Sequence, residues 1–213
     1  MGFVLFGLTG GLASGKSSVA ARWKARGLPV IDADELAREI VAPGSSALHE
    51  ITLAFGPAIL KKDGTLDRKR VADRVFADPE ARKKLEAITH PRIVAATLQR
   101  ASDLESRDEP LGCYEATLLV ERRVADNFRP LVVVSATEQA QVARAIARDK
   151  LSAKAVRARL SAQLPLHEKV AVADHVIDNS GSLAALIARA DDVLDAICKS
   201  YDIDPARYPL PGP

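Results

Sequence analysis

The chain has 213 residues, 47% of them hydrophobic, which is enough to bury one substantial core with small appended subdomains. Its 30 Lys and Arg against 28 Asp and Glu give a formal net charge of +2, and this near balance argues against a nucleic-acid-binding protein. The two cysteines, Cys113 and Cys198, lie outside any Cys/His cluster with metal-ligand spacing, which favours a reduced, cytoplasmic protein.

Five short apolar runs predict the strands of a parallel sheet. The first, Phe3 to Leu8, is too short to span a bilayer and leads directly into glycines, so we expect a buried strand and no membrane association. The other runs cover residues 28–31, 111–114, 131–134 and 175–177. Helical stretches separate them, so the sequence predicts an α/β fold with a five-stranded parallel sheet and helices on both faces.

Two helical regions interrupt this pattern. Roughly eighty residues separate the second predicted strand from the third, far more than a crossover needs. We expect a helical substrate-binding insert at 35–100 between core segments 1–34 and 101–200, with helices broken at Pro43-Gly44, Gly56-Pro57, Asp63-Gly64 and Pro79. An Arg- and Lys-rich stretch at 139–169 predicts a helical lid, and the Pro-rich tail 201–213 is expected to fray or lie on the surface.

The strongest motif is Gly10-Gly11-Leu12-Ala13-Ser14-Gly15-Lys16-Ser17, which fits G-x-x-x-x-G-K-[ST] between a predicted strand and a predicted helix at 17–26. Glycines let successive backbone N–H groups point into one concavity, and the following helix adds its positive end. Lys16 would neutralise the β and γ phosphates of ATP, and the Ser17 hydroxyl would ligate Mg²⁺. Ser18 is also a candidate nucleotide contact. The alternative is an ordinary glycine turn.

Acidic residues follow two of the predicted strands, at the edge of the sheet where open α/β folds bind ligands. Asp32 is the candidate general base, since a carboxylate there can accept the proton of an attacking hydroxyl. Asp34 is a candidate substrate contact, and either aspartate could instead cap the helix that starts near Glu35. Glu115 could hold the water shell of a metal, or it could be a solvated loop residue.

Several motifs together resemble the dephospho-CoA kinase family over about residues 3–195. In the family's order they are Gly7-Leu8-Thr9-Gly10-Gly11 with the loop that follows, Ile31-Asp32-Ala33-Asp34 with Leu36-Ala37-Arg38, Asp63-Gly64-Thr65-Leu66-Asp67-Arg68, Thr89-His90-Pro91, Leu118-Leu119-Val120-Glu121, Gln163, and Ala173-Asp174-His175-Val176-Ile177-Asp178-Asn179. The sequence departs from the family at Thr117, where proline is common, and at Ala13, where glycine is frequent.

The resemblance implies transfer of the ATP γ-phosphate to the ribose 3′-hydroxyl of dephospho-CoA, the last step of coenzyme A synthesis. It implies that Asp32 is the general base and that the insert forms the substrate side. His90 and Arg92 are then candidate substrate contacts. The alternative for His90 is a helix-terminal histidine before a proline, held by backbone hydrogen bonds.

Basic residues of the predicted lid are candidates for phosphate contacts. Arg144 and Arg148 are four residues apart, so they share one helical face from which guanidinium groups can reach phosphates. Arg144 is the candidate for stabilising transition-state charge, Arg148 and Asn179 for binding ATP, and Arg159 for binding substrate. The alternative for each arginine is a solvated basic face.

Two other functions stay open. Another P-loop kinase, acting on a nucleoside monophosphate or a small sugar acid, would share the loop, the lid and the insert. A regulatory switch that binds ATP or GTP without an acceptor is the alternative from a different class, although the chain has no Asn-Lys-x-Asp element for reading guanine. We expect no obligate protein partner.

Overall fold

The computed structural model describes residues 2–212, and the chain divides into two compact units. One unit comprises Met1–Ile31 with Leu104–Pro213, and the other comprises Asp32–Asp103. No helix within residues 2–212 is both long enough and apolar enough to cross a membrane.

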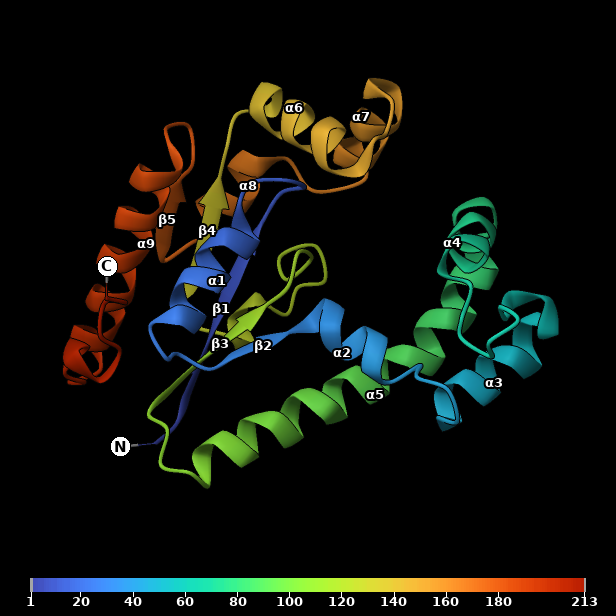
Figure 1. Ribbon diagram of the computed structural model, residues 1–213, viewed down its shortest axis with the longest axis horizontal. Helices are drawn as coiled ribbons and strands as arrows, with labels where there is room; N and C mark the ends of the chain where they lie inside the picture. The colour runs from blue at the N-terminus through green and yellow to red at the C-terminus, as the bar shows by residue number, and fades with distance from the viewer. Residues whose placement is uncertain (1, 213) are drawn as a thin grey trace. The chain divides into compact units, whose positions relative to one another are not determined.

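The sheet has the strand order β2-β3-β1-β4-β5 (Figure 1). Its strands are β1 (Val4–Gly10), β2 (Val30–Asp32), β3 (Leu111–Glu115), β4 (Leu131–Ser135) and β5 (His175–Asp178). β1 pairs in parallel with β3 and with β4, and β4 pairs in parallel with β5. The predicted strands and the α/β parallel fold are therefore confirmed. Because parallel strands end at the same edge, the ends of β1, β3 and β5 all lie at the ligand-binding edge of the sheet.

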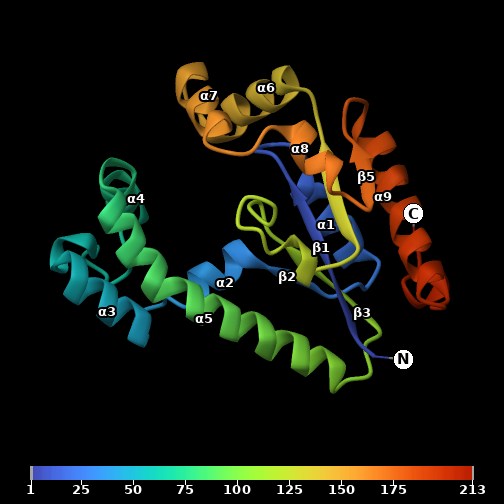
Figure 2. The ribbon, with the colours of Figure 1, turned by 180° about the vertical axis from the view of Figure 1, so that it is seen from behind.

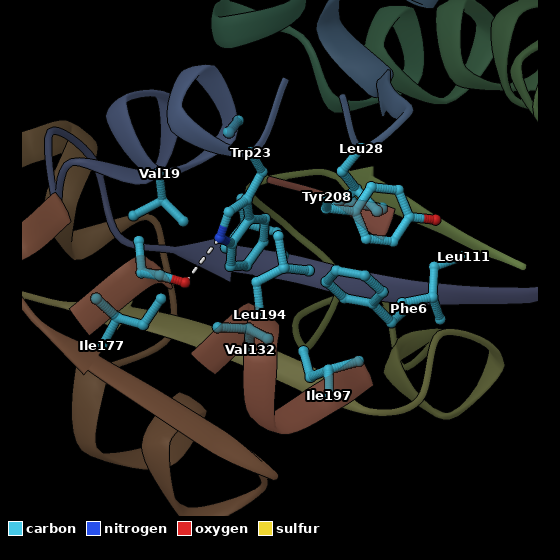
Figure 3. Packing of buried hydrophobic residues seen from close by; sticks show 14 of the residues in the cluster. Phe6, Val19, Trp23, Leu28, Leu111, Val132, Ile177, Leu194, Ile197 and Tyr208 are labelled. Atoms are coloured by element: carbon cyan, nitrogen blue, oxygen red, sulfur yellow. Dashed lines mark hydrogen bonds between the residues drawn. The ribbon is translucent and has the colours of Figure 1, made fainter. Parts of the chain in front are cut away.

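Helices α1 (Lys16–Ala25) and α9 (Leu183–Ser200) pack on one face of the sheet and form the main core with it. Trp23 of α1 is fully buried and meets the Phe6 ring edge-on, with 5.5 Å between ring centroids. Its Nε1 donates to the Ala190 carbonyl of α9 at 2.8 Å (Figure 3), which satisfies the polar atom of a buried indole. The helix that follows the glycine-rich loop is thus fixed to α9.

The other face of the sheet is covered by the segment between β3 and β4 and by α8 (Leu166–Ala171), which lies beside β4 in both views (Figures 1 and 2). Phe128 of that segment stacks on Tyr114, with 4.4 Å between centroids. A side chain at Gly7 would collide with Phe128, so glycine is required there. Helices α6 (Glu138–Asp149) and α7 (Ala153–Ser161) connect β4 to α8, which confirms the helical character predicted for 139–169.

The second unit has its own core, centred on Ile51 and Phe55. Its elements are α2 (Ala33–Glu39), α3 (Ser46–Phe55), the 3₁₀ turn η1 (Pro57–Ile59), α4 (Arg68–Ala77) and α5 (Pro79–Glu105). All four predicted breaks fall between helices or at the first residue of a helix.

His90 does not end a helix, because Pro91 lies inside α5. Leu85 and Ile88 pack against the core of the unit before the proline, and Thr97 is buried after it. Burial on both sides holds the helix together where proline removes one backbone hydrogen bond.

The tail, expected to fray or lie on the surface, is exposed or half-buried at every described position except Tyr208. Tyr208 follows the 3₁₀ turn η3 (Pro205–Arg207), is only 1% exposed, and belongs to the main core (Figure 3). Its carbonyl accepts Nε of the buried Arg26 at 2.9 Å. Arg26 also pairs with Asp191 at 3.3 Å and with Asp195 at 2.5 Å. Tyr201 and Ile203 also pack against the core, and Arg207 pairs with Glu109 at 3.1 Å. No periodic sequence pattern predicts these contacts.

We expect Tyr208→Ala to lower the free energy of unfolding by about 3 kcal/mol, because it removes a buried ring from a packed core. Leu210→Ala is the matched control in the same tail, because Leu210 is 61% exposed and its loss should change stability by less than about 0.5 kcal/mol. Urea unfolding can be followed by the fluorescence of Trp23, the single tryptophan, which lies in the same core cluster. Equal effects of the two substitutions would show that the tail does not stabilise the core.

Candidate active site

The loop formed by residues 10–17 joins β1 to α1, and its conformation depends on two positive φ angles. Gly15 is the N-cap of α1 with φ of 102°, and a side chain there would overlap the side-chain amide of Asn179. Ala13 has φ of 54°, a left-handed conformation that glycine adopts more easily. Ala13 therefore costs some backbone strain at a position that would suit glycine.

The backbone amides of this loop fall into two groups. The amide of Leu12 donates to Gln163 Oε1 at 3.1 Å, and that of Ser14 donates to the Gly11 carbonyl at 3.1 Å. Within residues 2–212 no protein acceptor is found for several others, among them the amides of Ala13, Gly15, Lys16 and Ser17. Unpaired amides at the start of a helix favour an anionic ligand, and phosphate fits that requirement.

Glu115 is buried against this loop. Lys16 Nζ lies 2.6 Å from Glu115 Oε1, and the Ser17 hydroxyl donates to the same oxygen at 3.3 Å. Glu115 is only 3% exposed, so the alternative of a solvated loop residue is wrong. The reason is topological, because β3 lies next to β1 inside the sheet and its last residue is covered by the loop that follows β1.

Arg144 and Asn179 also lie beside the loop. Asn179 is the first residue after β5 and is 6% exposed, and its Nδ2 donates to the Ser14 carbonyl at 2.7 Å. Arg144 of α6 donates from Nη2 to the Asn179 carbonyl at 3.0 Å and to Oδ1 at 3.4 Å. Nη1 of Arg144 is buried without an acceptor among the described residues. A guanidinium with free hydrogen-bonding capacity therefore stands next to the phosphate-binding loop.

The other two candidate arginines, Arg148 and Arg159, make no hydrogen bond or ion pair to the described residues of the loop. Arg148 of α6 makes a bidentate pair with Asp149, with distances of 2.7 and 3.0 Å. The hydrogen bonds from Arg148 lower the pKa of Asp149, and burial raises it by a smaller amount. The positive charges of Arg148 and Arg159 lower it further. Arg159 lies in the last turn of α7. Ser18 is in the first turn of α1, where its amide donates to the Gly15 carbonyl at 3.0 Å.

The remaining candidates belong to the second unit. Asp32, the last residue of β2, caps α2 by accepting at Oδ1 from the amides of Asp34 at 2.8 Å and Glu35 at 3.3 Å. Asp34 is exposed in the first turn of α2. Arg92, on α5 with His90, pairs with Glu50 at 2.6 Å.

The second unit also contains a concentration of charge near Asp34. Burial lowers the pKa of Arg68, the first residue of α4; the charge of Arg38 adds to that effect, and Asp34 partly opposes it. Neither arginine has an ion pair or a hydrogen-bonded side-chain partner within the described part of the chain. This surface is suited to an anion.

Two contacts of the loop come from glutamines that sequence reasoning did not place there. Gln163 belongs to the motifs that resemble the family, but the sequence did not predict its hydrogen bond with the Leu12 amide. Gln141 of α6 is 5% exposed, and a side chain at Gly11 would overlap its amide group. Contacts between residues this far apart in the chain leave no local pattern.

We expect Gly15→Ala to reduce ATP affinity by about 10-fold, because the new methyl group would displace Asn179 and break its hydrogen bond to the Ser14 carbonyl, which shapes the loop. Gly27→Ala is the matched control, since Gly27 also has a positive φ, of 88°, but has open space around it. That control should lose about 1 kcal/mol of stability and bind ATP normally. Isothermal calorimetry measures both affinities, and similar losses would mean that the contact with Asn179 is unimportant.

Comparison with known proteins gives a consistent result. The dephospho-CoA kinase family model matches residues 4–185. The dephospho-CoA kinase of Anaeromyxobacter dehalogenans is 47% identical over 190 residues, covering 89% of this chain and 90% of the relative. That of Geobacter sulfurreducens is 45% identical, covering 89% of this chain and 96% of the relative.

Solved structures agree in fold. Protein TT1252 of Thermus thermophilus superimposes with a TM-score of 0.82 at 36% identity, covering 92% of this chain and 98% of its own. Dephospho-CoA kinase from Campylobacter jejuni gives a TM-score of 0.70 at 31% identity over the same shares. A shikimate kinase from Acinetobacter baumannii, 17% identical with a TM-score of 0.52 over 93% of this chain and 94% of its own, shares the fold. The chain therefore belongs to the dephospho-CoA kinase family, a family of ATP-dependent phosphotransferases that act on a hydroxyl group.

Proposed function

We propose that this chain transfers the γ-phosphate of ATP to the ribose 3′-hydroxyl of dephospho-CoA, the last step of coenzyme A synthesis. The observation that carries the proposal is the loop 10–17, with unpaired amides and with Lys16 at its end, in a member of this family. The proposed location is the cytoplasm, which is supported by two free, buried cysteines.

Three cationic or hydrogen-bonding groups would bind the phosphates. The loop amides would hold the β-phosphate, and Lys16 would leave Glu115 to neutralise the β and γ oxygens. Arg144 would stabilise the charge that spreads over the transferred group, using the Nη1 that has no acceptor among the described residues. Asn179 would hold Arg144 in a fixed position relative to the loop, since it is hydrogen-bonded to both. Arg148 would reach ATP only by leaving Asp149.

Ser17 and Glu115 fit a Mg²⁺ ion. A hydroxyl and a carboxylate oxygen, 3.3 Å apart, are the hard ligands that this ion prefers. Few protein ligands suffice, because Mg²⁺ in nucleotide-binding sites is commonly held by one or two side chains together with phosphate oxygens and waters. When bound, Mg²⁺ would neutralise charge on the β and γ phosphates.

Asp32 would act as the general base. Both capping hydrogen bonds go to Oδ1, and Oδ2 has no partner within residues 2–212. The cap fixes the orientation of the carboxylate, and the second oxygen stays able to accept the proton of the 3′-hydroxyl.

The second unit would bind dephospho-CoA. Asp34, His90 and Arg92 are proposed contacts, and Arg159 of α7 is proposed to reach the same substrate. Arg92 has to exchange Glu50 for the substrate. The unpaired arginines at positions 38 and 68 support this assignment, because dephospho-CoA carries a diphosphate.

We expect Asp32→Asn to lower kcat by about 10² to 10⁴, because asparagine cannot accept the proton. Stability should hold, since asparagine caps helices as well as aspartate does. Asp67→Asn is the matched control, because Asp67 caps α4 in the same unit by accepting from the Arg70 amide at 3.1 Å. Steady-state formation of ADP with dephospho-CoA, together with thermal unfolding, distinguishes the two roles. Full activity in Asp32→Asn would exclude this residue as the base.

A further inference from the structure

Lys169 of α8 is a fully buried lysine with no role in the chemistry proposed above. Its exposed fraction is 0%, and its Nζ lies 2.6 Å from Glu121 Oε1 and donates to the Thr117 carbonyl at 3.2 Å. Desolvating two charges offsets much of their attraction, so apolar residues often stabilise such a position as well. Stability alone therefore does not explain a buried ion pair at this position, and its hydrogen bonds indicate another role.

Glu121 connects this ion pair to the phosphate-binding loop. Its Oε1 also accepts the backbone amide of Leu164 at 3.2 Å. The preceding residue, Gln163, accepts the amide of Leu12 through its side-chain Oε1 at 3.1 Å. Glu121 thus holds the backbone from which the side chain of Gln163 reaches the loop.

The same ion pair is linked to the strand that enters the loop. The Thr117 carbonyl accepts a hydrogen bond from Lys169 and another from the hydroxyl of Thr9 at 3.1 Å. Thr9 is the residue directly before the loop. Thr9 and Leu12, near the start of the loop, are therefore both connected to Lys169 and Glu121 by hydrogen bonds.

A cavity borders the loop at Gly11 and Gln163. The cavity has a volume of about 590 Å³, and Gly11, Gln141, Arg157 and Gln163 are among the residues that line it. The hydrogen bond from Leu12 to Gln163 therefore lies at the edge of an open space, where it constrains the position of the half-buried Leu12.

We propose that Gln163, oriented by the Lys169 and Glu121 ion pair, is a positioning residue that fixes Leu12 so that the neighbouring loop amides face the phosphates of ATP. The proposal rests on the proposed function only in taking ATP as the ligand. Gln163 and Lys169 lie on either side of the start of α8, directly after the α6 and α7 hairpin. The segment that ends the hairpin therefore also shapes the loop.

Gln163→Met tests the first step, because it keeps side-chain length and removes the acceptor. The dissociation constant of the non-hydrolysable analogue AMP-PNP with Mg²⁺ should rise about 3- to 10-fold, as expected for one lost hydrogen bond. KM for ATP should rise in parallel, and KM for dephospho-CoA should stay within about 2-fold. Gln139→Met, at an exposed glutamine of α6, is the matched control and should change neither constant.

Glu121→Gln tests whether the ion pair acts through Gln163. Glutamine keeps an acceptor for the Leu164 amide but leaves Lys169 without its counter-ion. We expect it to weaken AMP-PNP binding in the otherwise native chain and to have no additional effect in the Gln163→Met background. A merely structural pair would lower the melting temperature in both backgrounds and leave AMP-PNP affinity unchanged, and that result would overturn the proposal.

Gln163→Met remains decisive if Glu121→Gln does not fold, because unchanged AMP-PNP affinity in Gln163→Met would also overturn the proposal. Failure of the native chain to phosphorylate dephospho-CoA would refute the proposed function. The comparison of AMP-PNP affinity between the native chain and Gln163→Met would still test the role of Gln163. The two failures are therefore distinguishable.

Discussion

The loop between β1 and α1 has to present several unpaired amides to one point in space, and the surrounding structure is arranged around that requirement. Because these amides have no hydrogen bond that fixes them, neighbouring groups have to hold the loop in shape. Gly15 allows the turn, Asn179 binds the Ser14 carbonyl, and Gln163 binds the Leu12 amide. The loop is therefore held from outside by side chains that come from the ends of β5 and α7.

Electrostatics completes this arrangement. Lys16 is placed among amides that already favour anions, and Glu115 provides its counter-charge at 2.6 Å. The ion pair keeps a nearly buried lysine neutralised, and a phosphate ligand can replace the carboxylate as partner. Glu115 then stays beside Ser17, where a divalent cation would find its ligands.

Residues with local signals were predictable from the sequence. The five strands followed from apolar runs, the helices of the second unit followed from their Pro and Gly boundaries, and Lys16 and Ser17 followed from the spacing of the motif. The rest depends on contacts between distant segments. Glu115 is buried because β3 lies next to β1 in the sheet. Tyr208 packs into the main core although it lies in a Pro-rich tail. Helix α5 continues through Pro91 because residues before and after the proline are packed. No local pattern identified Lys169 as buried or Gln163 as a partner of the loop.

The transfer of phosphate to the ribose 3′-hydroxyl is tested most directly with two acceptors that differ only at that position. Dephospho-CoA carries a free 3′-hydroxyl, and coenzyme A carries a phosphate there. We predict ADP formation with dephospho-CoA and a product that gains one phosphate and co-elutes with coenzyme A. With coenzyme A as acceptor, we predict no ADP formation above background. Equal ADP formation with both compounds, or a phosphate at another position of the product, would contradict this prediction.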